Sequence, residues 1–156
     1  MGVLFKEIEH IIDRQDKAEQ AFLAEYKKGS YTIEHPYVVV NPYLIAPLTA
    51  LVMFEAEKPA FAKVTVKGKE AAGDYMYRPA SDMYHMVLPI YGLYPEYENT
   101  VVIELSTGET KELKIQTEAR PKKLHKPTSI QTTPEYFGDN MMFVSPTSPA
   151  LTAAYD

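Results

Sequence analysis

Four histidines are the residues of this chain best suited to proton transfer, nucleophilic attack or metal binding near neutral pH. They are His10, His35, His85 and His125, and each falls in a different segment. No two of them share the spacing at which helical histidines bind zinc or iron, so the sequence predicts no metal site. His85 shares a face of a strand-like segment with Met83 and Val87, which favours a histidine in a core or at its rim over a general base.

A site that binds phosphate or sulfate needs cations or a glycine-rich backbone around the anion. The arginines, Arg14, Arg78 and Arg120, lie in separate segments, and the glycines are not clustered. No phosphate-binding loop, dinucleotide fingerprint or serine nucleophile elbow occurs. The acids Glu55 and Glu57 are interpreted as the solvated end of a strand. Because no nucleophile, base and oxyanion site assemble, we expect no catalytic residue and no cofactor.

Tyrosine is the unusual component, with 12 tyrosines and no tryptophan. Half of the tyrosines gather in one stretch, at positions 75, 77, 84, 91, 94 and 97. Exposed tyrosine rings can stack on sugars or fill a protein interface. In sandwich folds they also brace corners and rims, with the hydroxyl hydrogen-bonded. The sequence leaves these roles open.

An alternating pattern of apolar and polar residues predicts the elements that would position these side chains. Between residues 31 and 116, period-two segments cover 37–40, 50–57, 61–67, 75–78, 83–91, 100–105 and the region around Leu113 and Ile115. Gly108, in the link 106–109, favours a hairpin turn. About seven short strands with regularly spaced turns predict a mainly β, immunoglobulin-like sandwich of two sheets.

The stretch from residue 41 to 57 is central to this pattern. Pro42 and Pro47 are expected to keep its first half extended and non-helical. Its second half alternates, with residues 50, 52, 54 and 56 on one face and residues 51, 53, 55 and 57 on the other. We expect one face to join a core and the other to become polar toward Glu57.

Apolar residues at alternating three- and four-residue spacing predict an α-helix over residues 4–28, ahead of the strands. The stripe is apolar at both ends and polar around residues 13–17, so it lacks the continuous seam of a coiled coil. A helix laid across a neighbouring surface is the simpler interpretation. A helix that pairs with another subunit is the alternative.

Beyond residue 118 the composition changes. Arg120, Lys122, Lys123 and Lys126 lie close together, and prolines recur from Pro121 onward. We interpret residues 119–138 as an extended linker that is basic and rich in proline, although the basic cluster could also meet an anionic partner. Strand-like runs at 141–144 and 151–155 are expected to begin a further domain that the sequence cuts off.

Length and charge limit the remaining function classes. A chain of 156 residues favours one domain with extensions, and a formal net charge of -5 gives no electrostatic reason to bind nucleic acid. The absence of cysteine excludes disulfides and thiolate sites. No apolar run is long enough to cross a membrane as a helix, and the first residues do not form a secretory signal peptide.

Several phrases of the sequence resemble the amino-terminal domain of bacterial arylsulfate sulfotransferases, the family that works without the nucleotide sulfate donor. They begin with Asn41-Pro42-Tyr43 and Ala46-Pro47-Leu48-Thr49, and include residues 62–69. They end with Pro89, Gly92-Leu93-Tyr94 and residues 99–101. The resemblance covers about residues 37–117. Where a glycine commonly follows Pro-Tyr in that family, this chain has Leu44.

The resemblance implies a larger periplasmic or secreted enzyme with a β-sandwich followed by a six-bladed β-propeller. Such an enzyme moves a sulfuryl group between phenols through a propeller histidine, and no position of this chain matches that histidine. The implied division is a helix at 1–30, a sandwich at 31–118, a linker at 119–138 and the start of a propeller at 139–156.

We therefore expect a non-catalytic domain with a structural role, in contact with the propeller of its own chain or with a second subunit as a homodimer. A free-standing immunoglobulin-like module that binds glycan or protein through its tyrosines is the alternative.

Overall fold

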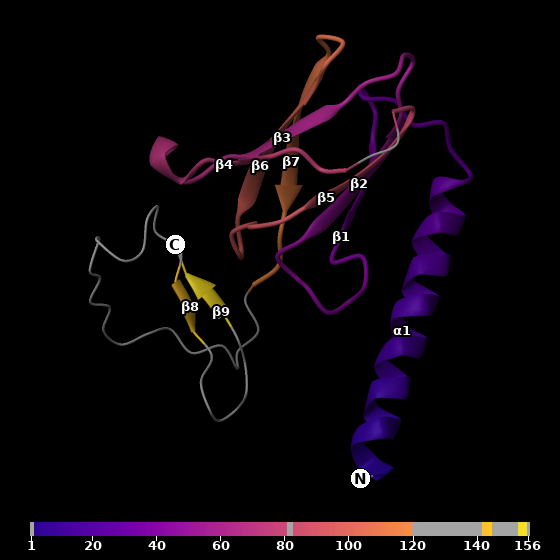
Figure 1. Ribbon diagram of the computed structural model, residues 1–156. Helices are drawn as coiled ribbons and strands as arrows, with labels where there is room; N and C mark the ends of the chain where they lie inside the picture. Colours follow the sequence, from indigo (N-terminus) through magenta and orange to yellow (C-terminus); the bar gives the residue numbers. More distant parts are fainter. Residues whose placement is uncertain (1, 81–82, 120–141, 145–152, 156) are drawn as a thin grey trace. The chain divides into compact units, whose positions relative to one another are not determined.

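The computed structural model describes residues 2–80, 83–119, 142–144 and 153–155 of the chain (Figure 1). These residues belong to two units, Met1–Ala119 and Arg120–Asp156, and each is described by itself. The first unit contains one α-helix, seven strands and a short 3-10 helix at Ala71–Gly73. The described residues of the second form two short strands.

The seven strands of the first unit form two antiparallel sheets, as the alternating sequence predicts. The three-stranded sheet has the order β1 (Tyr37–Val40), β2 (Ala50–Glu55), β5 (His85–Ile90). The four-stranded sheet has the order β4 (Tyr75–Tyr77), β3 (Ala62–Val66), β6 (Glu98–Leu105), β7 (Thr110–Gln116). Gly108 adopts a φ of 100° in the hairpin between β6 and β7, which is the conformation its position was expected to require.

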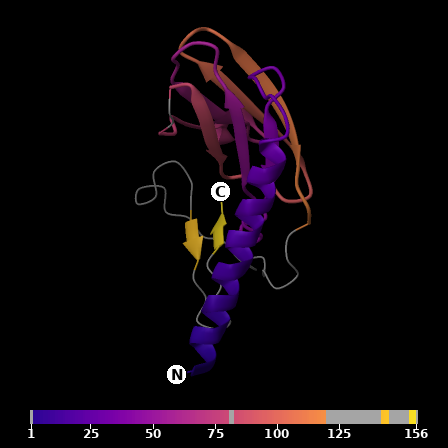
Figure 2. The ribbon, with the colours of Figure 1, turned by 90° about the vertical axis from the view of Figure 1, so that its right-hand side faces the viewer.

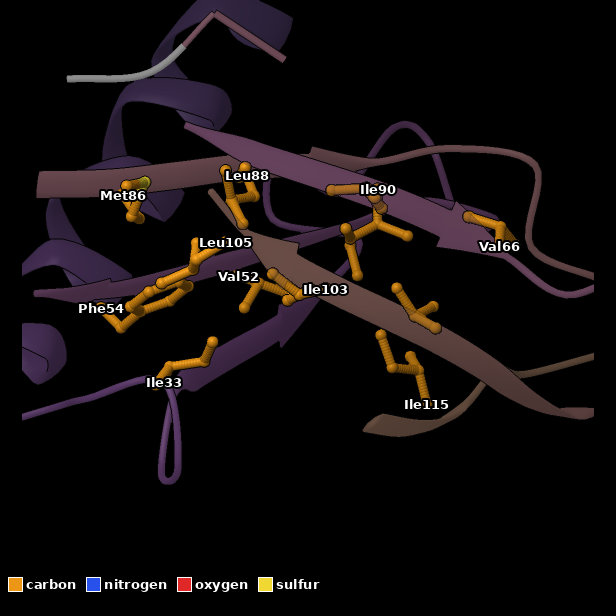
Figure 3. Packing of buried hydrophobic residues seen from close by; sticks show 14 of the residues in the cluster. Ile33, Val52, Phe54, Val66, Met86, Leu88, Ile90, Ile103, Leu105 and Ile115 are labelled. Atoms are coloured by element: carbon orange, nitrogen blue, oxygen red, sulfur yellow. The ribbon is translucent and has the colours of Figure 1, made fainter. Parts of the chain in front are cut away.

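The inner core lies between the two sheets and is built from the alternate residues of each strand (Figure 3). From β2 it receives Val52 and Phe54, which face Val64 of β3 and Ile103 of β6. Met86, Leu88 and Ile90 of β5 complete the contribution of the three-stranded sheet. We call this set of buried residues the inner cluster.

A second hydrophobic cluster lies on the opposite face of the three-stranded sheet, where helix α1 (Gly2–Tyr26) packs (Figures 1 and 2). Phe22 of the helix is buried against Leu51 and Met53 of β2. We call these three residues, with the partly buried side chains around them, the outer cluster. The expectation that only one face of β2 joins a core was therefore incomplete, because both faces are buried up to the exposed Glu55.

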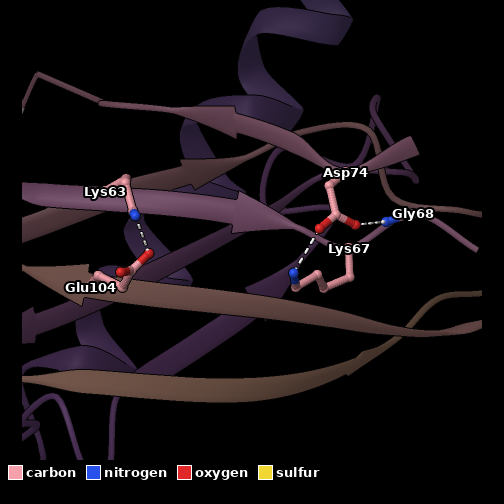
Figure 4. Close-up of polar contacts among 5 residues, drawn as sticks. All are labelled: Lys63, Lys67, Gly68, Asp74 and Glu104. Atoms are coloured by element: carbon pink, nitrogen blue, oxygen red, sulfur yellow. Dashed lines mark hydrogen bonds and ion pairs between the residues drawn. The ribbon is translucent and has the colours of Figure 1, made fainter. Parts of the chain in front are cut away.

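The outer face of the four-stranded sheet is polar, as the alternation predicts for a face turned to solvent. Lys63 on β3 pairs with Glu104 on β6 at 2.5 Å between Nζ and Oε2, directly across the strands (Figure 4). Lys114 lies 2.8 Å from Glu112 on β7. This sheet is covered on one face and the three-stranded sheet on both, so α1 adds a third layer to the sandwich.

The second unit is described for β8 (Met142–Val144) and β9 (Ala153–Tyr155), which pair antiparallel with Met142 opposite Tyr155. The strand-like runs predicted near residues 141–144 and 151–155 are confirmed for these two segments. Apart from Ala119, the predicted linker over 119–138 lies outside the described residues, and so does most of 139–156.

Candidate interface at one end of the sandwich

Three loops and the exit of the chain gather at one end of the first unit. The strand registers place them there, because Val40 pairs with Ala50, Ala50 with Ile90, and Val66 with Val101. The loops are residues 41–49 between β1 and β2, residues 67–74 between β3 and β4, and residues 91–97 between β5 and β6. We call this the motif end, because most of the positions that carry the family resemblance lie in or beside these loops.

The loop between β1 and β2 consists of two consecutive β-turns. The Leu44 amide donates to the Asn41 carbonyl at 3.0 Å, and the Thr49 amide donates to the Ala46 carbonyl at 3.1 Å. Asn41 has a φ of 50° and its side-chain oxygen accepts a hydrogen bond from the Ala46 amide at 2.9 Å, which joins the turns. The expectation of an extended segment at residues 41–49 was wrong, although the prolines do keep it non-helical.

Leu44 is strained and exposed at the tip of this loop. Its φ of 61° lies in the left-handed region, which a branched side chain without a local hydrogen bond rarely adopts. The side chains of Leu44 and Ile45 are 53% and 59% exposed. Leu44 therefore adopts a backbone conformation that suits glycine, and it adds an apolar group to the surface.

Tyr43, which precedes Leu44 in the same loop, connects the loop to helix α1. Its hydroxyl donates to Glu19 Oε1 at 3.0 Å, and its ring meets Phe22 edge-on with centroids 5.8 Å apart. Burial and the bond to Glu19 raise the pKa of the Tyr43 hydroxyl. Tyr43 lies in one of the motif phrases, and it anchors helix α1, which lies outside the residues that carry the family resemblance.

The loop between β5 and β6 is held by the buried side-chain amide of Asn99, for which the sequence predicted no structural role. Asn99 accepts from the Tyr94 amide at 2.7 Å and donates to the carbonyls of Tyr94 and Tyr97 at 3.1 and 3.0 Å. Gly92 precedes this turn with a φ of 74°. The Leu93 amide donates to the Leu48 carbonyl at 3.2 Å, so the two main motif phrases are bonded to each other.

The exit of the chain is fixed to the same loop. The buried Thr117 donates from its hydroxyl to the Tyr94 carbonyl at 2.5 Å, and the Glu96 amide donates to the Glu118 carbonyl at 2.9 Å. The chain therefore leaves the sandwich beside the motif loops, along a path set by these hydrogen bonds.

The loop between β3 and β4 is closed by Asp74, which accepts from the Gly68 amide at 3.0 Å and pairs with Lys67 at 2.6 Å (Figure 4). These contacts lower the pKa of the Asp74 carboxyl. A Cβ on Gly68 would lie 2.5 Å from the Gly73 backbone, so the tight loop requires glycine there. Lys69 of this loop lies 4.8 and 5.4 Å from the ring centroids of Tyr94 and Tyr97, in cation–π geometry.

Three further tyrosines form a row beside the motif end. Tyr75 stacks on Tyr77 with centroids 5.4 Å apart, and Tyr77 lies 6.0 Å from Tyr91. The Tyr77 hydroxyl donates to the Pro89 carbonyl, and burial raises its pKa. Tyr77 is thus a brace of the kind expected in sandwich folds, whereas Tyr75 and Tyr91 are exposed.

His85, the histidine that the sequence placed in a strand, lies at the opposite end of β5. Its Nδ1 is 2.6 Å from Glu55 Oε1, and the same oxygen accepts from the Tyr26 hydroxyl at 3.2 Å. This exposed contact joins the end of α1 to the sheet, so Glu55 is more than the solvated acid expected. Burial, and then the Glu55 charge, raise the pKa of Tyr26 to about 12.

Among the described residues no group of three or more acids, histidines and cysteines could hold a metal ion. No helix in the described part of the chain is long and apolar enough to span a membrane. The motif end offers a hydrogen-bonded backbone that displays apolar and aromatic side chains, Leu44, Ile45 and Tyr91 among them.

Comparison with known proteins finds a family that matches the whole sandwich. The family described as "Arylsulfotransferase Ig-like domain" matches residues 37–119. The chain is 40% identical over 70 residues to the arylsulfate sulfotransferase AssT of Escherichia coli O6:H1 and 37% identical over 70 residues to that of Lelliottia amnigena. Each alignment covers 43% of this chain and only 12% of the relative. No solved structure matches the chain at comparable significance.

Proposed function

Because the chain belongs to the family of arylsulfotransferase Ig-like domains, we propose that it supplies the non-catalytic N-terminal domain of an arylsulfate sulfotransferase. In this proposal the motif end is the surface that contacts the catalytic domain. That domain is a β-propeller, whose histidine carries the sulfuryl group from one phenol to another. The enzyme works outside the cytoplasm.

The observation that carries the proposal is the strained and exposed tip of the loop between β1 and β2. A residue in the left-handed region costs about 1–2 kcal/mol when it is not glycine. Strain of this kind is typical of sites that function by contact with a ligand or partner. Here it presents Leu44 and Ile45 to the surface at the end where Thr117 and Glu118 lead the chain away.

The chemistry of sulfuryl transfer supports a division between two domains. The reaction needs cations and hydrogen-bond donors fixed around a developing oxyanion. On the described sandwich, the lysines that are held in place are engaged by acids or rings, as Lys67 is by Asp74 and Lys69 by two tyrosines. We therefore expect the 156-residue chain alone to show no turnover of an aryl sulfate with a phenol acceptor, measured as release of the donor phenol.

Reading the gene beyond codon 156 is the simplest test. Several hundred further residues with repeated strand blocks support the proposal, and a stop codon would contradict it. If the gene continues, an assay of the full-length protein with aryl sulfate and phenol then establishes its activity.

The interface itself can be tested in the full-length protein with a protease site inserted after Ala119. After cleavage, the two parts should remain associated. Ile45→Glu should weaken their association at least tenfold, because it places a charge in an apolar contact. Phe61→Glu is the matched control, since Phe61 is 65% exposed and lies at the opposite end of β3. Equal effects of the two variants would contradict an interface at the motif end.

A second candidate function rests on the tyrosine row. Tyr75 and Tyr91 are exposed beside Tyr77, an arrangement on which a sugar ring or a protein could stack. A glycan array probed with the 156-residue chain and with its Tyr75→Ala variant would test this function. Binding that the variant loses would favour the binding module.

A further inference from the structure

We infer that the stretch of α1 around Ile11, residues 10–17, forms a second wall of the interface at the motif end. In this inference, which rests on the proposed function, the domain that packs on Leu44 and Ile45 also packs on the helix around Ile11. The helix lies outside residues 37–119, the part of the chain that the family model matches.

The face of the helix that docks on the sheet continues past the sandwich, polar at Gln15 and apolar again at Ile11. Residues three and four apart lie on one face of a helix, so the face of Tyr26 and Phe22 continues through Ala18 and Gln15 to Ile11. Burial falls along this face. Phe22 is buried, Ala18 and Gln15 are half-buried, and Ile11 is 46% exposed. This face of the helix therefore extends beyond the sheet that covers it.

The exposed stretch of the helix, residues 10–14, lies beyond the point where the loop between β1 and β2 contacts it. Tyr43 meets the helix at Glu19 and Phe22, and every side chain from His10 to Arg14 is exposed. At 1.5 Å per residue, Ile11 lies about 16 Å beyond Phe22 along the axis. Figures 1 and 2 show this half of α1 extending past the end of the sandwich on the side of the loop between β1 and β2. The helix face and the motif end therefore form two sides of one corner.

The position of the chain exit favours the domain that follows in the same chain as the partner that packs against these two surfaces. Thr117 and Glu118 are bonded to the loop between β5 and β6, so the described chain leaves the sandwich at the motif end, which is one side of this corner. A domain tethered there has a high effective concentration, whereas a second copy must bind from solution. Ile11 and Ile12 alone offer far less than the roughly 800 Å² per partner of a stable interface, but they extend the surface of Leu44 and Ile45.

The test uses the same full-length protein cleaved after Ala119. Ile11→Glu should weaken the association of the two parts at least fivefold. His10→Glu, one residue away and about 100° around the helix, should change it less than twofold. Both sites are exposed and glutamate is a good helix former, so both variants should unfold at the same denaturant concentration as the wild type.

Hydrogen exchange provides a second measurement. The amides of residues 10–17 should exchange at least tenfold more slowly in the full-length protein than in the 156-residue chain, at any protein concentration. Slowing in the 156-residue chain that grows with concentration, together with a doubled mass, would overturn the inference in favour of a second copy. If Ile45→Glu weakens the association and Ile11→Glu does not, this inference fails and the proposed function stands. If neither variant weakens it, this inference fails together with the proposed interface at the motif end, whereas the gene sequence and the activity assay still test the rest of the proposed function.

Discussion

The inner and outer clusters use the same strand in opposite ways. β2 gives Val52 and Phe54 to the inner cluster between the sheets, and Leu51 and Met53 to the outer cluster beneath α1. The inner cluster draws on both sheets, whereas the outer cluster depends on one helix and one strand at its centre. The difference suggests that the sandwich is the unit that folds cooperatively, and that the helix is a layer docked on it.

The largest effect should come from the inner cluster. Phe54→Ala should lower the free energy of unfolding by about 3–5 kcal/mol, because it leaves a cavity between two sheets that cannot close around it. Urea unfolding followed by circular dichroism measures the change. Phe61→Ala, at an exposed phenylalanine, should change it by less than about 0.5 kcal/mol.

The matching change in the outer cluster should be smaller and local. Phe22→Ala should cost about 2 kcal/mol, because the helix can detach and so limit the loss to its docking free energy. Limited proteolysis should then cut within α1 while the sandwich stays intact. Loss of both parts in a single transition, with a cost equal to that of Phe54→Ala, would show that the clusters form one cooperative unit.

The loop between β1 and β2 touches both clusters, through Tyr43 on Phe22 and through Leu48 on the inner cluster. Leu44→Gly should raise the free energy of unfolding by about 1 kcal/mol, because glycine adopts a φ of 61° without steric cost. Leu44→Ala is the control, since alanine keeps the strain and should bring no gain. The same glycine variant should weaken the proposed interface, because it removes an exposed apolar side chain.

The smallest effect concerns the alkaline stability of the outer cluster. The pKa of Tyr26 is raised to about 12, so its hydroxyl stabilises the folded state fully below about pH 10. This contribution is lost as the pH rises toward 12. We expect a loss of at most about 1 kcal/mol, because the group is partly exposed to solvent. Between pH 9 and pH 12, the free energy of unfolding of the Tyr26→Phe variant should therefore fall less than that of the wild type.

The strands, the hairpin and the family were predicted from particular patterns in the sequence. The alternation in β2, β3 and β6 predicted the strands and their inner faces, and Gly108 predicted the hairpin. The interpretation of His85 as a residue at the rim of a core agrees with its contact to Glu55 at the end of the sheet. The motif phrases predicted the family, which the match over residues 37–119 confirms.

Other features depend on contacts between residues far apart in the chain. Nothing local to Asn99 shows that its amide would join the turn at Tyr94 to the strand before Thr117. The Leu44 substitution was visible, but its φ depends on the two turns that hold the loop. The place of Asn99 in the motif phrase at residues 99–101 is the signal that could have drawn attention to it.

By itself the sequence determined the period of each element, because side-chain direction along a strand or helix repeats locally. It therefore determined which residues share a face. Only the tertiary structure decided which faces are covered, because burial depends on what another part of the chain places there. Leu51 and Met53 are core residues only because Phe22 lies on them, and Ile11 is exposed only because the sheet ends before it.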